Sequence, residues 1–106
     1  MVSRHLYITL PSGMARVVDL SCITLIGRDS ENDIVLDDAM ISRHHAMLFA
    51  KPQGSVLIDL ESTNGTLING RLVLPDTPVL LEDGTMIAFG PVIACYREGV
   101  DRHPDR

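Results

Sequence analysis

Short apolar runs, each closed by turn residues, constrain what this chain can fold into. The runs are four to seven residues long and end at Gly, Pro, Asn or Asp. None of them continues at helical spacing for long enough to form a substantial helix, so the pattern predicts an all-β protein. Turns about 8 to 12 residues apart are typical of a β-sandwich or barrel rather than of a parallel sheet covered by helices.

These runs predict ten or eleven short strands. The clearest connection is Asn69-Gly70, because both residues tolerate the positive φ angles of a type I′ hairpin turn. The expected strands are residues 6–10, 14–20, 23–26, 34–36, 45–50, 56–59, 66–68, 71–73, 79–81, 85–89 and 92–97.

The length of the chain allows one domain. With 106 residues there is room for a single hydrophobic core, since domains run from about 50 to 200 residues. We assign residues 1–97 to this domain. Residues 98–106 are polar and contain Pro104, so we expect a fraying tail or the start of a linker.

The charge of the chain limits its partners. A net charge of -5 opposes nonspecific binding to nucleic acid or to an anionic membrane. It does not exclude a local anion site, because carboxylates more than about 8 to 10 Å away are screened. No apolar stretch approaches the roughly 18 residues of a membrane span, and residues 1–5 do not open a signal peptide. We expect a cytoplasmic location.

The two cysteines, Cys22 and Cys95, lie inside apolar runs and far apart in the sequence. They lack the close pairing of a metal site or a redox motif. We expect both to be reduced core residues. The sequence implies neither a metal nor another cofactor.

Three polar segments interrupt the strand pattern at or near strand ends. They are Gly27-Arg28, Ser42-Arg43-His44-His45 and Ser62-Thr63-Asn64-Gly65-Thr66. Arginine presents paired donors that match two phosphate oxygens, and serine adds a compact hydroxyl donor. The third segment has the composition of a loop whose backbone N–H groups form an anion-holding concavity. Together the segments predict a site for a phosphate dianion.

Each segment alone has a simpler interpretation. Arg28 could form a surface ion pair with a neighbouring carboxylate, and Ser42 could belong to an ordinary turn. The third segment could be a plain loop. It is the joint occurrence of three donor-bearing loops in an acidic protein that favours anion binding.

The adjacent histidines have separate roles. In a strand, His44 and His45 point to opposite faces, so they cannot share a metal ion. We expect His45 to be buried and neutral at the start of a strand, where its hydrogen bonds hold the loop in place.

The ordered set of motifs resembles the forkhead-associated (FHA) domain family. The family pattern is Gly-Arg, Ser-Arg-x-His, Ser-x-Asn-Gly-Thr and Asn-Gly, and the same order is found here between Gly27 and Gly70. The likeness extends from about Leu6 to Tyr96. It implies an eleven-stranded, mainly antiparallel β-sandwich with binding loops at one end. It also implies recognition of a threonine-phosphorylated protein or peptide in a Ser/Thr kinase pathway.

The resemblance assigns a role to each matching residue. It implies that the phosphate is bound by Arg28, Ser42, Arg43 and Thr63. It implies that Asn64 binds the peptide backbone, and that the loops are shaped by Gly27, His45, Gly65 and Asn69. One departure from the family pattern is Thr85, which replaces a usual Asp in a turn.

The same residues suggest two other function classes. A phosphorylation-independent interaction domain would use a face of the sandwich and bind modified and plain partners equally. A hydrolase with Ser42 as nucleophile and His45 as base lacks the Gly-x-Ser-x-Gly turn and an oriented acid, so we expect no enzyme activity. Within the phosphopeptide interpretation, Met40 favours an apolar peptide residue a few positions after the phosphothreonine.

Overall fold

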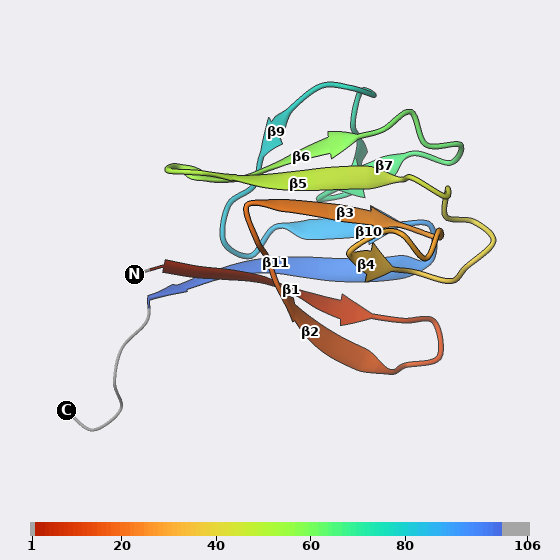
Figure 1. The fold of residues 1–106 in the computed structure, drawn as a ribbon, viewed down its shortest axis with the longest axis horizontal. Helices are drawn as coiled ribbons and strands as arrows, with labels where there is room; N and C mark the ends of the chain where they lie inside the picture. The colour runs from red at the N-terminus through yellow and green to blue at the C-terminus, as the bar shows by residue number, and fades with distance from the viewer. Residues whose placement is uncertain (1, 101–106) are drawn as a thin grey trace.

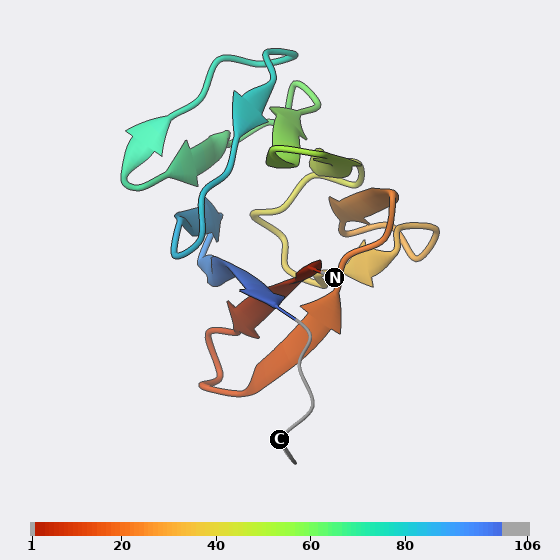
Figure 2. The ribbon, with the colours of Figure 1, turned by 90° about the vertical axis from the view of Figure 1, so that its left-hand side faces the viewer.

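Two β-sheets packed against each other form the molecule. The computed structural model describes residues 2–100 and shows a six-stranded and a five-stranded sheet in this range (Figures 1 and 2). Figure 2, seen from the left-hand side of Figure 1, shows the sheets as separate layers. The predicted all-β sandwich is confirmed.

The order of the strands differs from their order in the chain. The six-stranded sheet runs β2 (Ala15–Asp19), β1 (Val2–Thr9), β11 (Val92–Val100), β10 (Met86–Phe89), β7 (Thr66–Ile68) and β8 (Arg71–Leu72). The five-stranded sheet runs β4 (Ile34–Val35), β3 (Ile23–Gly27), β5 (Ala46–Lys51), β6 (Gly54–Asp59) and β9 (Val79–Leu80). The β3–β4 pair is parallel, and the other strand pairs described are antiparallel.

The core lies between the two sheets. In β1, Leu6 and Ile8 are buried and Tyr7 is exposed, as expected because successive side chains of a strand point to opposite faces. Phe89 and Tyr96 come from β10 and β11, and they join one cluster with buried residues of the other sheet. The alternation in the sequence therefore identifies the buried face of the longer strands.

The Asn69-Gly70 hairpin connects β7 and β8 as predicted. The φ angles of the two residues are 50° and 83°, which a type I′ turn requires. Asn69 also accepts a hydrogen bond from Met86 N–H through Oδ1 (2.9 Å) and donates its own N–H to Met86 O (2.8 Å). These bonds attach the hairpin to β10.

The predicted end of the domain at residue 97 is too early. β11 continues to Val100, and its last residues pair with the first residues of β1, such as Ser3 with Gly99 and Arg4 with Glu98. The apolar pattern missed this extension because a ladder of backbone hydrogen bonds does not need apolar side chains. Residues 101–106 of the expected tail lie outside the described residues.

The expectation that both cysteines are core residues is also wrong. Cys22 is exposed just before β3, and Cys95 is half-buried. Cys95 pairs with Tyr7 and Met86 across the ladder, on the face of the sheet that points away from the core. The alternation of β11 places Ala94 and Tyr96 inside, so Cys95 faces outward.

Thr85 closes its turn in place of an aspartate. Its Oγ1 donates to Glu82 O (2.7 Å) and accepts from Glu82 N–H (3.1 Å). Asp83 in the same turn accepts hydrogen bonds from Arg97 Nε (2.9 Å) and from Glu98 N–H (2.8 Å). A hydroxyl is therefore sufficient to close the turn at this position.

Three loops gather at one end of the sandwich, on the right in Figure 1. They are the β3–β4 loop (28–33), the β4–β5 loop (36–45) and the β6–β7 loop (60–65). The opposite end holds the start of β1 and the β5–β6 turn. The residues of all three polar segments therefore lie at the same end.

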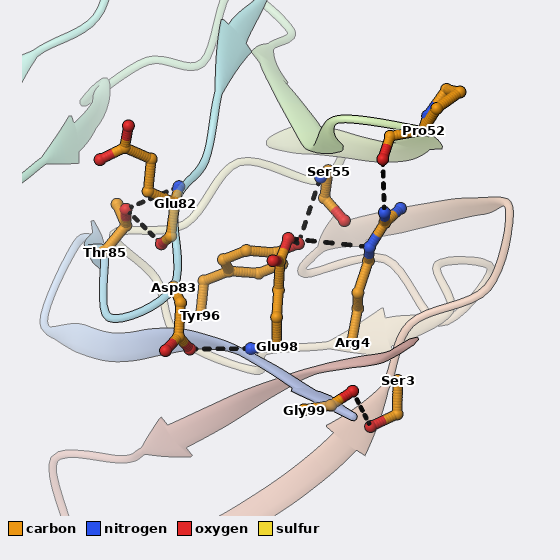
Figure 3. A network of polar contacts seen from close by, with 10 residues as sticks. All are labelled: Ser3, Arg4, Pro52, Ser55, Glu82, Asp83, Thr85, Tyr96, Glu98 and Gly99. Atoms are coloured by element: carbon orange, nitrogen blue, oxygen red, sulfur yellow. Dashed lines mark hydrogen bonds and ion pairs between the residues drawn. The ribbon is translucent and has the colours of Figure 1, made fainter. Parts of the chain in front are cut away.

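A polar network at that opposite end joins the two sheets (Figure 3). The buried Tyr96 hydroxyl accepts a hydrogen bond from Ser55 N–H (3.2 Å) and donates one to Glu98 Oε2 (2.6 Å). The same carboxylate oxygen lies 3.8 Å from Arg4 Nε. Burial, followed by the hydrogen bond to Glu98, raises the pKa of the Tyr96 hydroxyl.

We expect Tyr96→Phe to lower the free energy of unfolding by about 1–3 kcal/mol, because it leaves the buried Ser55 N–H without its acceptor. Urea denaturation measures the change. Tyr7→Phe on the exposed side of β1 is the matched control and should change stability little. Equal stability of the two variants would contradict this role of the network.

Candidate functional site

The end of β3 and the β4–β5 loop are in backbone contact. Arg28 N–H donates to Ser42 O (2.9 Å), and Asp29 N–H donates to Arg43 O (3.2 Å). A Cβ atom at Gly27 would clash with the Arg43 carbonyl oxygen and would lie 2.8 Å from Asn32 Nδ2. Gly27 therefore permits this close approach of two backbone segments, which holds Arg28 beside Ser42.

Arg28 is exposed, and one nitrogen of its guanidinium is already bonded within the protein. Its Nε donates to Ile41 O at 2.9 Å. This contact does not use the two terminal amino groups of the guanidinium, which form the outer edge of the fork. The strand end and the Ile41 carbonyl thus fix the position of the cation before any ligand arrives.

The β4–β5 and β6–β7 loops are also joined. Ser42 Oγ accepts a hydrogen bond from Thr63 N–H (2.9 Å), and Asn64 Nδ2 donates to Met40 O (2.8 Å). Two loops that are about 20 residues apart in the chain therefore meet at one edge of the molecule. We call this edge, formed by the β4–β5 and β6–β7 loops together with Arg28, the rim. The contact with Met40 O uses the amide nitrogen of Asn64, so its amide oxygen is left as a separate acceptor.

A small hollow lies where these residues meet. It has a volume of about 100 Å³ and is lined by Arg28, Ala39, Met40, Ile41, Ser42, Thr63 and Asn64. Four of the five residues predicted to contact a phosphopeptide are thus brought together. The fifth, Arg43, is exposed and does not line the hollow, although its carbonyl group ties the loops together.

His45 connects the two loops of the rim through its ring nitrogens. It is buried, its Nδ1 accepts the Ser42 N–H (3.1 Å), and its Nε2 lies 3.0 Å from Gly65 O. Because Nδ1 is an acceptor, the ring is the neutral tautomer that donates from Nε2. Burial lowers the pKa of His45, and the Gly65 hydrogen bond and Asp59 oppose this shift. His44 is exposed, as expected for the opposite face.

This arrangement does not suit His45 as a general base. A base for Ser42 would need a free ring nitrogen within reach of Oγ. Here one nitrogen accepts a backbone N–H and the other donates to a backbone carbonyl. Both nitrogens thus hold loop backbone, and Ser42 Oγ itself accepts the Thr63 N–H.

The backbone conformation favours glycine at position 65. Its φ angle is 84°, in the left-handed region that disfavours side chains. The side chain of Leu72 also packs on Gly65, since a Cβ atom there would lie 2.5 Å from Leu72 Cδ1. The β6–β7 loop is therefore in contact with β8.

Two residues that hold the loops were not identified from the sequence. Asn32 is buried and donates through Nδ2 to Asp29 O (2.8 Å) and Arg43 O (2.7 Å). Asp59 is buried at the end of β6 and accepts hydrogen bonds from Ser62 and Thr66. An Asp three residues before a Ser at a strand end is a local turn signal that could have pointed to Asp59.

Two features are absent from the part of the chain that the structure describes. In residues 2–100 we find no helix that is both long enough and apolar enough to cross a membrane. The same range holds no group of three or more His, Cys, Asp or Glu side chains placed to bind a metal ion.

Curated relatives match part of this chain. An ABC transporter ATP-binding/permease protein of Mycobacterium tuberculosis is 39% identical over 74 residues, which are 70% of this chain and 8% of the transporter. The transcriptional regulatory protein EmbR of the same organism is 42% identical over 64 residues, which are 60% of this chain and 16% of EmbR. The chain thus spans less than a fifth of the length of either relative.

Solved structures and a family model agree on the fold. The structure of Mycobacterium tuberculosis EmbR in complex with a low-affinity phosphopeptide has a TM-score of 0.79 and 33% identity, covering 93% of this chain and 26% of that chain. A structure from an analysis of phosphothreonine-dependent FHA domain interactions has a TM-score of 0.76 and 31% identity, covering 94% and 98%. The FHA domain model matches residues 24–90. This chain belongs to the FHA domain family.

Proposed function

We propose that this chain is a phosphothreonine-dependent binding module for a protein or peptide partner. The observation that carries the proposal is the hydrogen-bonded junction of three loops around one hollow. Arg28, Ser42 and Thr63 come from three separate loops, yet they line the same small depression. The guanidinium of Arg28 and the hydroxyls of Ser42 and Thr63 are groups that recognise phosphate oxygens.

The charge of the ligand explains why such a site would distinguish phosphothreonine from plain threonine. A phosphothreonine carries about -1.5 to -2 charges and three strong acceptor oxygens. Plain threonine offers a single neutral hydroxyl to the same donors. Because Nε of Arg28 is already bonded to Ile41 O, the guanidinium would lose little freedom when it binds, and this preorganisation favours affinity.

The contacts support a role for each residue of the site. Arg28, Ser42 and Thr63 would bind the phosphate, and Arg43 would contribute from outside the hollow as an exposed cation. Asn64 would hold the peptide backbone with the amide oxygen that its bond to Met40 O does not use. His45, Gly27 and Gly65 would keep the loops in place, while Asn69 would hold the hairpin behind them.

Preference for threonine over serine needs an apolar contact for one methyl group. The hollow includes the side chains of Ala39 and Met40, and Met40 is exposed. We assign the methyl contact to this apolar edge, where burial of one methyl group is worth about 0.8 kcal/mol. The flexible Met40 side chain would also accept apolar peptide residues after the phosphothreonine.

Two relatives support this function. The EmbR structure that resembles this chain holds a phosphopeptide, and another similar FHA structure comes from an analysis of phosphothreonine-dependent interactions. By this likeness, the partner would be the product of a Ser/Thr kinase. Titration of the chain with matched threonine and phosphothreonine peptides from an unbiased library tests the proposal. Equal affinity for the two forms would establish a phosphorylation-independent interaction domain instead.

We expect Arg28→Ala to weaken binding of the selected phosphopeptide by roughly 2–5 kcal/mol, because it removes one partner of a charged hydrogen-bonded pair. Isothermal titration calorimetry measures the change. Arg71→Ala on β8 removes the same charge outside the hollow and is the control. Wild-type affinity of the Arg28 variant would remove the main support for the proposed site.

Ser42→Ala should weaken phosphopeptide binding by about 1–3 kcal/mol, because the Thr63 N–H loses its acceptor and the phosphate loses a hydroxyl donor. The same titrations measure it. Ser12→Ala, which removes a hydroxyl that accepts the Met14 N–H in the β1–β2 turn, is the matched control. An effect of equal size in the control would argue against a specific role for Ser42.

His45→Gln should lower the melting temperature and remove a pH dependence. Burial holds the pKa of His45 below its usual 6.5, so the unfolded state takes up a proton first as the pH falls. The contribution of His45 to stability is therefore complete above pH 6.5 and decreases below it. Between about pH 7.5 and about pH 5.5, urea denaturation should show a larger loss of stability for wild type than for the variant.

The other histidines are present in both proteins, so their contributions cancel in this comparison. A variant with an unchanged melting temperature but lost phosphopeptide binding would show instead that His45 contacts the ligand.

A further inference from the structure

The outward side of the six-stranded sheet carries an apolar surface, which we call the apolar face. It consists of Val17, Tyr7, Ile93, Met86, Leu67 and Leu72, whose exposed fractions lie between 38% and 67%. Single exposed apolar residues are normal in soluble proteins, but contiguous patches mark interaction sites. The question is therefore whether these side chains form one surface.

The strand register shows that they do. Tyr7 pairs with Val17 on one side and with Cys95 on the other, and Cys95 pairs with Met86. A second row, nearer the loops, runs from Ile93 through Ala88 and Leu67 to Leu72. Side chains that are directly opposite on neighbouring strands are in contact, so the two rows form a continuous surface across the sheet.

The next row of the same face is polar. Asp19 pairs with His5, and His5 pairs with Arg97, which forms an ion pair with Asp83 (2.9 Å). This row lies on the side of the apolar face that is farther from the binding loops. The apolar surface is thus bounded toward the chain termini and reaches toward the loop end.

A hollow in the apolar face has room for a side chain. Its volume is about 330 Å³, and it is lined by Leu67, Gly70, Met86, Ile87, Ala88 and Ile93. This volume is at the low end of ligand cavities, which span roughly 300–1,000 Å³. A single leucine or aromatic side chain is the ligand that an apolar hollow of this size would hold.

The apolar face adjoins the candidate phosphate site. Gly65 follows Asn64 in the β6–β7 loop, and its backbone packs so closely on Leu72 that a Cβ atom would lie 2.5 Å from Cδ1. From Gly65 to Gly70 the chain advances five residues, or about 16 Å of strand. A ligand bound at the rim could therefore reach the hollow with about five extended residues.

The size of the face favours a short segment over a second copy of the chain. Each of the two rows crosses four strands that lie about 4.8 Å apart, so together they cover roughly 250–300 Å². A stable dimer buries about 800 Å² on each partner. The face is thus too small to hold two copies together, and its size suits a short segment of a partner.

We propose that the apolar face binds an apolar segment of the same phosphorylated partner, close in sequence to its phosphothreonine, with one large apolar side chain in the hollow. This inference rests on the proposed function, because the phosphate site anchors the partner next to the face. Binding at the loops makes the second contact intramolecular, so a weak apolar contact adds usefully to the affinity. Contact with the phosphate would make binding depend on phosphorylation. Contact with the apolar segment would distinguish one phosphorylated partner from another.

The experiment compares two peptides. The first is a short phosphothreonine peptide selected for binding from an unbiased library. The second is the same peptide with a randomised segment of roughly eight residues added on either side. The extended peptides are then selected for binding in a second round. The variants Met86→Ser and Leu67→Ser alter the hollow at half-exposed positions. Leu80→Ser, at an exposed position on β9 of the other sheet, is the control, and thermal melts confirm that all variants are folded.

We expect the extended peptide to bind wild type about tenfold more tightly than the short one, the gain of one good apolar anchor. Met86→Ser and Leu67→Ser should lose most of this gain and keep the affinity for the short peptide. Leu80→Ser should keep both. The selected extensions should carry a leucine or an aromatic residue.

The contrary outcomes are distinguishable. If no extension adds affinity, or if the gain persists in both hollow variants, the inference is wrong and the proposed function stands. If the short peptide does not bind wild type in preference to its unphosphorylated form, the proposed function fails and this inference fails with it. If sedimentation shows a dimer that both hollow variants dissociate, a second copy occupies the face, and the inference is overturned.

Discussion

The binding end of this protein depends on one buried imidazole. His45 accepts the Ser42 N–H with one ring nitrogen and contacts Gly65 O with the other, so a single neutral ring joins two loops that come from different parts of the chain. Its edge also packs on Phe89, with ring centroids 5.6 Å apart, which ties the rim to the core. A protonated ring could not accept the Ser42 N–H, and it would place a charge in the core. Burial and loop geometry therefore require the same neutral state.

Beyond this ring, side chain–backbone hydrogen bonds also join the loops to one another. Arg28 contacts the Ile41 carbonyl, Asn64 contacts the Met40 carbonyl, and Ser42 accepts the Thr63 N–H. Each bond holds the donor or acceptor of one loop against the backbone of another. These bonds hold the polar groups of the loops in position on the β-sandwich before any anion is bound. The negative net charge of the whole chain would then discourage other polyanions while the local donors act at short range.

The longer strands and the Asn69-Gly70 hairpin were predictable because their signals are local. Alternation of Leu6 and Ile8 with exposed neighbours and the positive φ angles of the turn depend on residues close together in the chain. Asn32 was not predicted, because its partner Arg43 O lies eleven residues away and no short pattern links them. Glu98 to Val100 looked like a tail, since their strand pairing involves the start of β1. Cys22 and Cys95 were misassigned because apolar neighbours in sequence do not show which face a side chain occupies.

The sequence by itself determined the fold class, the family resemblance and the set of residues in the binding loops, since each of these follows from residue types in short ordered segments. Only the tertiary structure decided which of those residues share one hollow, that the side chain of Arg43 stands outside it, and that two rows of exposed apolar side chains meet across six strands. The physical reason is that strand order in the sheets differs from order in the chain. The β1–β11 and β7–β10 pairings join strands that are far apart in the chain, and no local pattern encodes them.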